Sequence, residues 1–368
     1  MARYFSYNDL FSFAKSLFIH IGCNETHADI AARSLLAADL RGVDSHGIAR
    51  LTGYVRLWEV NRLNSHPDIK VVYETPSTAV VDGDGGSGLV VGSYAMQVAI
   101  EKATHVGSGW VSVKNSNHFG IAGSTAMMAL EHDMIGIAMT NASPLVAPTF
   151  SIDRLLGTNP IAVAVPAGIE PPFVSDMATT TAANGKLELL QRKNAAAPLG
   201  WIQDAEGNAS CNPNELKNGG ALLPLGGDRE HGSHKGYALG AIVDIFSGVL
   251  SGANYGPWVP PFPAYIPMPE NMPGQGIGHF FGAMRVDAFR PAMDFKKHMD
   301  IWIQTFRNAR TIPGEKRVYI PGDIEREIEI ERKISGIPLV QSVIDELNIL
   351  SDKYKIPMPG GTVLHSTN

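Results

Sequence analysis

The stretch Thr78-Ala79-Val80-Val81-Asp82-Gly83-Asp84-Gly85-Gly86-Ser87-Gly88 decides between two folds. Its apolar run predicts a strand, and its last six residues satisfy G-x-G-x-x-G, which binds a dinucleotide in a Rossmann fold when it joins a strand to a helix. The acidic residue expected about twenty positions later is missing, because Glu101 comes too early and is followed by Lys102 and a glycine-rich turn. We therefore expect an ordinary strand-to-helix turn here and no dinucleotide site.

Outward from this stretch, β-branched runs alternate with helical stretches. Further strands are predicted at residues 69–73, 110–113, 135–139 and 161–165. Helices are expected between several of them, at 93–104, 124–132 and 235–250. The first sixty residues instead predict three helices. This alternation after a helical start indicates an α/β protein.

The composition is that of an ordinary globular protein of 368 residues, with 44% hydrophobic and 18% charged residues. A formal charge of -6 and the lack of long Lys/Arg runs argue against a nucleic-acid partner, because a polyanion needs a basic surface. We expect a cytoplasmic protein without membrane contact, since no signal pattern and no apolar run of about 20 residues occurs. Cys23 and Cys211 have neither disulfide nor metal-ligand spacing.

His46 and Arg50 stand four residues apart at an expected helix start, which Asp44 or Ser45 would cap. An arginine fork there could hold a carboxylate in two directed bonds. A histidine beside it could exchange a proton with a hydroxyl on the neighbouring carbon. Oxidation of a 2-hydroxy acid needs this pair of groups. A solvated histidine in a first helical turn is the simpler alternative.

Polar residues also gather where the predicted strands end or begin. They are His118 after 110–113, Asn141 to Ser143 after 135–139, Thr158 and Asn159 before 161–165, and Asp176 before an expected Ala-rich helix. Each segment alone is a weak signal, because Asn, Ser, Thr and Gly fill ordinary turns.

Lys235 lies at another expected helix start, after a glycine pair, and suits a phosphate or an amide of a cofactor. His231 and His234 stand nearby, but no Glu, Asp or Cys at ligand spacing accompanies them, so we predict no metal site. A metal-dependent hydrolase that uses some of the 12 histidines is the alternative from another class. The absence of HxH and HExxH spacing counts against it.

Together these segments resemble the type 2 malate/L-lactate dehydrogenase family, whose members also act on ureidoglycolate, sulfolactate, diketogulonate and cyclic imino acids. The motifs occur in the family's order over nearly the whole chain: Asp44-Ser45-His46-Gly47 with Arg50, Asn117-His118-Phe119-Gly120, Leu156-Gly157-Thr158-Asn159-Pro160-Ile161-Ala162, Asp176-Met177-Ala178-Thr179 with Gly185-Lys186, Leu223-Pro224-Leu225-Gly226-Gly227, Lys235-Gly236-Tyr237 and Pro321-Gly322-Asp323. The resemblance implies a non-Rossmann nicotinamide-binding α/β fold with helical N- and C-terminal portions around a central mixed sheet. It divides the chain into residues 1–70 packed with 285–368, and a cofactor-binding domain over 71–284.

By the same resemblance, His46 and His118 are the candidates for proton transfer, and relatives differ in which one is credited. Arg50 is the expected carboxylate clamp, with Ser45 supporting it. The resemblance assigns contacts with NAD or NADP to His118, Asn141, Ala142, Ser143, Thr158, Asn159, Asp176, Met177, Ala178, Lys235, Pro321, Gly322 and Asp323. The implied reaction is hydride transfer between NAD(P) and a small 2-hydroxy acid, malate or lactate first, in a homodimer whose active site lies near the interface. No metal is required.

Departures from the family pattern leave the substrate and the choice of NAD or NADP open. Ser233-His234 replaces the aromatic or basic pair expected before Lys235, and Thr180 stands where serine is common. The Pro- and Gly-rich loop at 252–276 has no clear counterpart, although a loop this long is usually functional. Ureidoglycolate, sulfolactate or diketogulonate chemistry and cyclic imine reduction remain alternatives. A non-catalytic binding protein is disfavoured, because His46, His118, Arg50 and Lys235 are all present.

Overall fold

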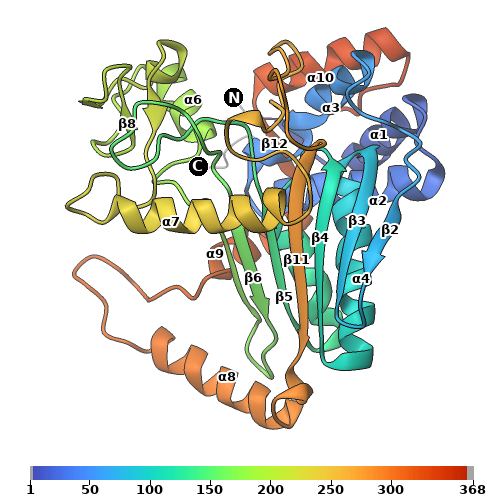
Figure 1. The fold of residues 1–368 in the computed structure, drawn as a ribbon, viewed down its shortest axis with the longest axis vertical. Coiled ribbons are helices and arrows are strands. Elements are labelled where there is room, and N and C mark those ends of the chain that lie inside the picture. Colours follow the sequence, from blue (N-terminus) through green and yellow to red (C-terminus); the bar gives the residue numbers. More distant parts are fainter. Residues whose placement is uncertain (1–2, 363–368) are drawn as a thin grey trace.

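A seven-stranded sheet forms the centre of the structure, a computed structural model that describes residues 3–362 (Figure 1). In spatial order its strands are Lys70–Glu74 (β2), Thr78–Gly86 (β3), Ser108–Ser116 (β4), Ile277–Arg285 (β11), Met134–Thr140 (β5), Ile161–Val165 (β6) and Phe173–Met177 (β7). β3 and β4 pair in parallel, and every other neighbouring pair in this sheet is antiparallel. The sheet is therefore mixed, which confirms the predicted α/β class and is unlike the mostly parallel sheet of a Rossmann domain.

Helices α4 (Gly88–Val106) and α5 (Ala122–Met127) lie directly on the sheet because glycine stands where they cross it. A Cβ atom on Gly109 would lie 2.0 Å from the carbonyl oxygen of Ala99, and one on Gly136 would lie 2.0 Å from that of Ala126. Only glycine permits so close an approach of two backbones. The short link from β4 to α5 carries His118, so this packing fixes that residue at the end of the sheet.

The central strand β11 was not among the strands predicted from the sequence. It pairs with β4 on one side and β5 on the other, and its first seven residues are buried. Gly278, His279 and Gly282 interrupt its apolar pattern. Packing requires both glycines, because a Cβ on Gly278 would lie 2.0 Å from the Ser247 carbonyl oxygen, and one on Gly282 would lie 2.6 Å from the Trp110 ring. A strand buried on both faces needs no alternation of apolar and polar residues.

The glycine-rich turn from Gly83 to Gly88 joins β3 to α4, as predicted, and protein atoms fill the space around it. The side-chain amide of Asn117 donates to the carbonyl oxygens of Gly85 and Gly86, at 2.8 and 3.1 Å. A Cβ on Gly88 would lie 2.1 Å from the Asn117 carbonyl oxygen. These contacts occupy the position that a pyrophosphate takes at a Rossmann turn, so the turn is structural.

Helices from both ends of the chain share one hydrophobic core. They are α1 (Tyr7–His20), α2 (Glu25–Leu40), α3 (Leu51–Glu59) and α10 (Gln341–Tyr354). Fully buried leucines join them, among them Leu17, Leu35, Leu51 and Leu347. The strands Arg3–Phe5 (β1) and Ile337–Leu339 (β12) pair antiparallel beside this core. The domain boundaries given above remain a prediction.

The remaining elements surround the far edge of the sheet. They are α6 (Asn184–Arg192), the short strands Ile202–Gln203 (β8), Ala209–Ser210 (β9) and Ala221–Leu222 (β10), α7 (Ser233–Asp244) with a π-helical turn at Ile245–Val249, α8 (Ala292–Arg307) and α9 (Asp323–Ser335). The Ala-rich helix expected directly after Asp176 is wrong, because Thr179 to Thr181 bond to neighbouring loops and the helix begins only at Asn184. Among the helices described between residues 3 and 362, none is both long and apolar enough to cross a bilayer.

Helix α8 lies at the bottom of Figure 1. Ion pairs of Lys296 with Asp133 and of Arg307 with Glu170 hold it to the body of the protein, and Asp300 adds a third attachment. The Asp300 carboxylate accepts hydrogen bonds from the backbone N–H groups of Gly168, Ile169 and Glu170, at 2.9 to 3.0 Å. Partial burial acts to raise the pKa of Asp300, but these three donors outweigh it and lower the pKa. One carboxylate thus ties α8 to the turn between β6 and β7.

Candidate functional site

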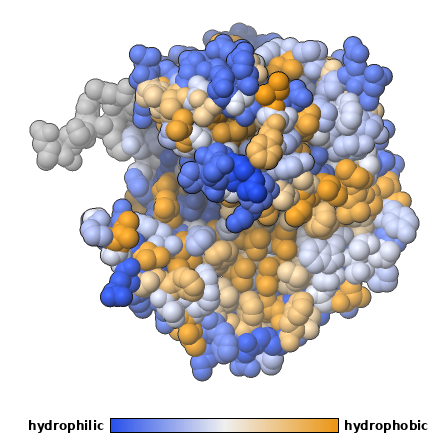
Figure 2. All heavy atoms as spheres, turned by 60° about the vertical axis from the view of Figure 1, so that its left-hand side comes forward, coloured by the Kyte–Doolittle hydropathy of each residue, from blue (hydrophilic) through white to orange (hydrophobic). Residues whose placement is uncertain are grey.

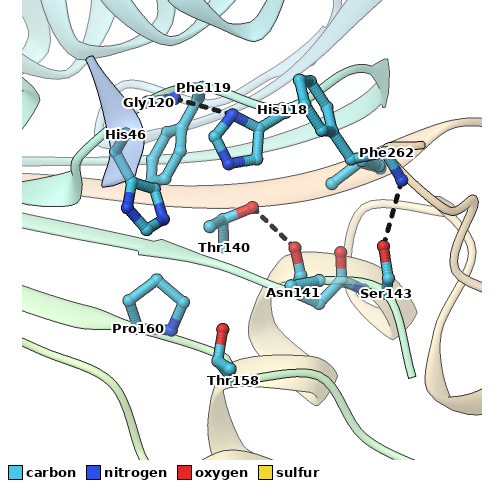
Figure 3. Close-up of a pocket in the computed structure, with 12 residues that line it drawn as sticks. His46, His118, Phe119, Gly120, Thr140, Asn141, Ser143, Thr158, Pro160 and Phe262 are labelled. Carbon is cyan, nitrogen blue, oxygen red and sulfur yellow. Dashed lines mark hydrogen bonds between the residues drawn. The ribbon is translucent and has the colours of Figure 1, made fainter. Parts of the chain in front are cut away.

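A small pocket lies where β4, β5 and β6 meet the helical layer, and two histidines face into it (Figure 3). Its volume is about 50 Å³, which is room for a few water molecules or for the reacting end of a small substrate. Its walls are formed by His46, His118, Phe119, Gly120, Thr140, Asn141, Ala142, Ser143, Thr158, Pro160, Phe262 and Ile277. Six of the predicted site residues therefore meet in one place: His46, His118, Asn141, Ala142, Ser143 and Thr158.

The helix predicted to begin at His46 is not there. Two 3₁₀ turns, Asp44–His46 and Ile48–Arg50, precede α3, and neither has a side-chain cap. Gly47 separates them with a non-helical backbone, at φ -90° and ψ -143°, and the Asp39 carboxylate accepts from the Ile48 N–H at 2.6 Å. A Cβ on Gly47 would lie 2.2 Å from that carboxylate. The buried Asp39, which the sequence gave no reason to single out, therefore takes the place of the expected Asp44 or Ser45 cap.

Arg50 nevertheless lies close to both histidines. Its Nε atom donates to the Ser45 carbonyl oxygen, and its positive charge contributes to the low pKa of His46 and of His118. Within residues 3–362, no carboxylate forms an ion pair with Arg50, whereas Arg41, Arg307 and Arg332 each have at least one. A guanidinium without a carboxylate partner is suited to bind an anionic ligand.

Each histidine is held through its Nδ1 atom. His46 Nδ1 lies 2.9 Å from the Ser45 hydroxyl, and His118 Nδ1 lies 2.8 Å from the Tyr54 hydroxyl. The two rings are nearly parallel, with centroids 5.6 Å apart. No described residue hydrogen-bonds to either Nε2 atom, so each Nε2 is available to a ligand.

Burial makes both histidines neutral at neutral pH. Burial, with a smaller contribution from Arg50, lowers the pKa of His46 to about 4. Burial and the neighbouring His46, Arg50 and His279 hold the pKa of His118 well below its usual 6.5. A carboxylate bound beside Arg50 would offset that positive charge and raise both pKa values toward the range in which a histidine can donate a proton.

Two strand-end asparagines on the opposite side of the pocket use their side chains for hydrogen bonds within the protein. The Asn141 amide donates to Asp244 at 3.0 Å and to the Asn254 carbonyl at 2.7 Å, and its oxygen accepts from the Gly278 N–H at 3.1 Å. Asn159 accepts from the Ala142 N–H and donates to the Gly240 carbonyl. Both asparagines are at most 1% exposed. Side-chain contacts of Asn141 or Asn159 with a cofactor, expected from the resemblance, would require these bonds to break.

The Pro- and Gly-rich loop at 252–276 supplies the pocket's aromatic cover. Phe262 packs on the His118 ring at 4.7 Å and against Tyr54 at 5.3 Å. Its N–H donates to the Ser143 hydroxyl, and Arg62 donates to the Pro261 carbonyl. A Cβ on Gly53 would lie 2.5 Å from the Phe262 ring, so α3 needs glycine there to admit the ring.

Asp176 and Met177 lie at the end of β7 beside the pocket but do not line it. The Asp176 carboxylate accepts from the Gly123 N–H at 2.7 Å. The residue is reached by solvent, yet protein atoms crowd around its carboxylate, as in a cleft, and this burial raises its pKa to about 6 despite that bond and Arg41. Met177 is 46% exposed, and Ala178 follows it.

The remaining predicted cofactor residues do not converge on the pocket. Lys235 is exposed in the first turn of α7. Pro321 and Gly322 contact Val174 near the start of β7, at the other end of the strand from Asp176 and Met177. The buried Asp323 carboxylate is already used by Arg307, Arg326 and the Ile320 N–H. If these segments bind a cofactor, they bind a part of it distant from the histidines.

Six residues that line the pocket were absent from the sequence-based set: Phe119, Gly120, Thr140, Pro160, Phe262 and Ile277. Tyr54, which bonds to His118 but does not line the pocket, was absent as well. Phe119, Gly120, Thr140 and Pro160 adjoin motifs that were recognised. Tyr54 had a weaker signal, its position four residues after Arg50. For Phe262 the signal was the unusual loop itself. Among the described residues, no group of three or more His, Cys, Asp or Glu side chains is arranged to hold a metal ion.

Comparison with known proteins gives consistent matches. The family model described as malate/L-lactate dehydrogenase matches residues 5–348. A malate dehydrogenase of Pyrococcus abyssi is 45% identical over 351 residues, which cover 95% of this chain and 94% of that protein. An L-sulfolactate dehydrogenase of Methanocaldococcus jannaschii is 37% identical, with 89% and 90% covered. The crystal structure of a malate dehydrogenase from Entamoeba histolytica superposes with a TM-score of 0.90 at 35% identity, covering 98% of this chain and all of that one.

Proposed function

Because the chain belongs to the malate/L-lactate dehydrogenase family, we propose that it transfers a hydride between NAD or NADP and a small 2-hydroxy acid or the matching 2-keto acid. Malate is the first candidate and lactate the second. The observation that carries this proposal is the pair of half-buried histidines with unpartnered Nε2 atoms beside an arginine that has no carboxylate partner among the described residues. Relatives named malate and sulfolactate dehydrogenase support the substrate class.

In the oxidative direction, a neutral histidine takes the proton of the substrate hydroxyl. The low pKa values of His46 and His118 keep both rings unprotonated and available as bases. A nicotinamide bound beside the pocket would supply the acceptor for the hydride that leaves the same carbon. In the reverse direction the imidazolium returns the proton to the carbonyl oxygen. Acid/base help of this kind contributes roughly 10²–10⁴ in rate.

Arg50 binds the substrate carboxylate in this proposal and thereby orients the neighbouring carbon toward the histidines. Its five N–H donors form a planar fork that matches a carboxylate. Phe262, Phe119 and Ile277 exclude water from the remaining walls. Binding in a closed pocket fixes one face of the reacting carbon, which is the positioning that hydride transfer requires.

NAD or NADP would bind along the open surface next to the pocket. The pocket alone is too small for a dinucleotide, so only the reacting edge of the nicotinamide would enter it. Ala142 and Thr158 line the wall, while Asp176, Met177 and Lys235 are solvent-accessible outside it. The Asp176 carboxylate is exposed and accepts only the Gly123 N–H among the bonds described, which supports a ligand at this position. We assign no preference between NAD and NADP.

A second copy of the chain would cover the apolar face that carries α7 and α8. Figure 2 shows hydrophobic side chains gathered across the middle of this face. Exposed members include Phe246 and Leu250 after α7, and Ile301, Trp302 and Phe306 on α8. Patches of this extent are typical of interfaces. α7 also backs the pocket, since Gly240 bonds to Asn159, so a homodimer through this face would lie near the site. Sedimentation of the purified chain measures this directly.

The decisive experiment follows absorbance at 340 nm with NADH and NADPH offered separately. Each is paired with oxaloacetate, pyruvate, sulfopyruvate and cyclic imines, with substrate-free reactions as controls. We expect turnover with at least one 2-keto acid. Turnover with imines alone would replace the substrate class, and the lack of both turnover and cofactor binding would contradict the proposal.

A further inference from the structure

We infer that Tyr54 is a positioning residue that decides which nitrogen of His118 carries a proton, and thereby makes His118 the group that exchanges a proton with the substrate. This inference rests on the proposed function. Tyr54 lies outside the family motifs quoted above, and its only sequence signal is its position four residues after Arg50. The argument begins with the hydrogen bonds around His118.

Three groups meet at His118 Nδ1, on the side of the ring away from the pocket. The Tyr54 hydroxyl lies 2.8 Å from Nδ1 and 3.3 Å from the His118 carbonyl oxygen. The Gly120 N–H points at Nδ1 from 3.3 Å (Figure 3). Tyr54 is fully buried, and its ring is fixed between Phe18 and Phe262. Only the hydroxyl hydrogen is therefore free to turn.

The hydroxyl can adopt two arrangements, and they have opposite consequences for Nε2. In one, Tyr54 donates to Nδ1, so a neutral ring carries its proton on Nε2 and cannot accept another there. In the other, Nδ1–H donates to the Tyr54 oxygen, the Gly120 N–H turns from Nδ1 to the same oxygen, and the hydroxyl donates to the His118 carbonyl. The second arrangement leaves a lone pair on Nε2, which a base in the pocket needs.

The proton balance also favours the second arrangement. When the substrate O–H bond breaks, an N–H bond forms at Nε2, and the hydride goes to the nicotinamide. The resulting imidazolium carries hydrogen on both nitrogens, and the Tyr54 oxygen continues to accept from Nδ1–H. The reverse reaction returns the Nε2 proton to the substrate oxygen. Burial raises the pKa of Tyr54, so the phenol stays neutral throughout and is not itself the acid.

His46 lacks a comparable support. Its Nδ1 partner is the hydroxyl of the adjacent Ser45, which is half-buried on a short turn. No second acceptor within residues 3–362 fixes the direction of that hydroxyl, whereas Tyr54 has the His118 carbonyl. The two stacked histidines thus differ in how firmly the hydrogen on Nδ1 is specified.

Removal of the hydroxyl tests this inference. In Tyr54→Phe, the Gly120 N–H is left as the partner of Nδ1, which favours the tautomer with hydrogen on Nε2. We expect kcat for 2-hydroxy acid oxidation to fall at least tenfold, with KM and the Kd of NADH within about twofold, and the pH profile of kcat to shift. Tyr354→Phe is the matched control, because it removes a tyrosine hydroxyl bonded to Glu59 far from the pocket.

Nitrogen NMR of the His118 ring gives a readout that does not depend on turnover. In the unaltered protein with NAD(P) bound we expect hydrogen on Nδ1, and in Tyr54→Phe hydrogen on Nε2. Hydrogen on Nε2 in the unaltered protein would overturn the inference even if the variant fails to fold. An unchanged kcat and pH profile in a folded Tyr54→Phe would do the same. Failure of all substrates in the absorbance assay would instead reject the proposed function, and the NMR result would still decide the role of Tyr54.

Discussion

The two walls of the pocket contain similar polar residues and use them in different ways. The histidine wall is defined here as His46 and His118, which line the pocket, together with Arg50 and Tyr54, which do not line it. On this wall neither Nε2 atom has a partner within the described chain. Arg50 donates from Nε to the Ser45 carbonyl oxygen, but its guanidinium has no carboxylate partner among the described residues. On the strand-end wall, the side chains of Asn141 and Asn159 make all their hydrogen bonds inside the protein.

This difference separates groups available for chemistry from groups that hold the scaffold. A buried polar atom that already has its partners gains little from a ligand, because each new bond costs an old one. A polar atom that faces a pocket without a partner is available to a substrate. We therefore expect substitutions on the histidine wall to change rates and substitutions on the strand-end wall to change stability.

The largest expected effect is the loss of turnover in His118→Ala. We predict a fall in kcat of about 10²–10⁴-fold, because proton transfer at Nε2 is lost. Binding of NADH, followed by fluorescence, and the unfolding midpoint change little. His46→Ala is expected to reduce kcat less, and the exposed His231→Ala serves as the control. A near-normal kcat in folded His118→Ala would remove its proton-transfer role.

Asn159→Ala tests the opposite wall. The substitution leaves the Ala142 N–H and the Gly240 carbonyl without partners in a fully buried position, and places alanine at a positive φ of 36°. We expect the free energy of unfolding in urea to fall by about 3 kcal/mol. Asn184→Ala, which removes a part-exposed bond to Glu188, is the control and should cost much less. Weakened NADH binding at unchanged stability would instead support the cofactor contact inferred from the resemblance.

His279 is a third histidine for the comparison, and its hydrogen bonds, like those of Asn141 and Asn159, are satisfied within the protein. Both its ring nitrogens are bonded, to Thr140 at 2.7 Å and to Ser116 at 2.8 Å, and burial lowers its pKa to about 3. The unfolded chain therefore takes up a proton at this histidine near pH 6.5, whereas the folded chain does not. The contribution of neutral His279 to the free energy of unfolding is complete above pH 6.5 and is lost as the pH falls toward 3.

Between pH 6.5 and 5, we expect the free energy of unfolding in urea to fall by about 2 kcal/mol less in His279→Gln than in the unaltered protein. The variant is also less stable at pH 7, so the test compares slopes and not absolute values. Equal slopes in the two proteins would show that His279 does not resist protonation when folded.

Arg50→Lys gives the smallest of these effects. Lysine keeps the charge but cannot form a two-pronged bond to a carboxylate. We predict an increase of about tenfold in KM for 2-keto acids, with kcat within a few-fold, which corresponds to about 1.4 kcal/mol of binding. Steady-state kinetics measure both constants. An unchanged KM would leave the carboxylate without its proposed clamp.

Elements that consist of a short, mostly apolar run between turns could be predicted from the sequence, as β5 and β6 illustrate. β11 could not, because its glycines are required by contacts with Ser247 and Trp110, which lie far away in the chain. The turn at Gly47 was read as helix because the buried Asp39 that organises it gives no local signal.

In the candidate site, too, some residues could be predicted from the sequence and others could not. His46, His118 and Arg50 could be selected because their side-chain chemistry is distinctive. Asn141 could be placed at the end of a strand, but the direction of its amide depends on Asp244, Asn254 and Gly278, more than a hundred positions later. Local sequence marks polar residues and does not reveal whether the fold already satisfies them.

Chemical rescue of His118→Ala tests most directly that the histidine wall carries the chemistry. The substitution leaves space for an imidazole, so added imidazole should raise kcat with NAD(P)H and the preferred 2-keto acid in proportion to its concentration, and its effect should follow the pKa of free imidazole. The unaltered protein and Asn159→Ala should not respond. A folded variant that binds NADH and shows no rescue, or equal rescue of Asn159→Ala, would contradict the assignment of proton transfer to His118.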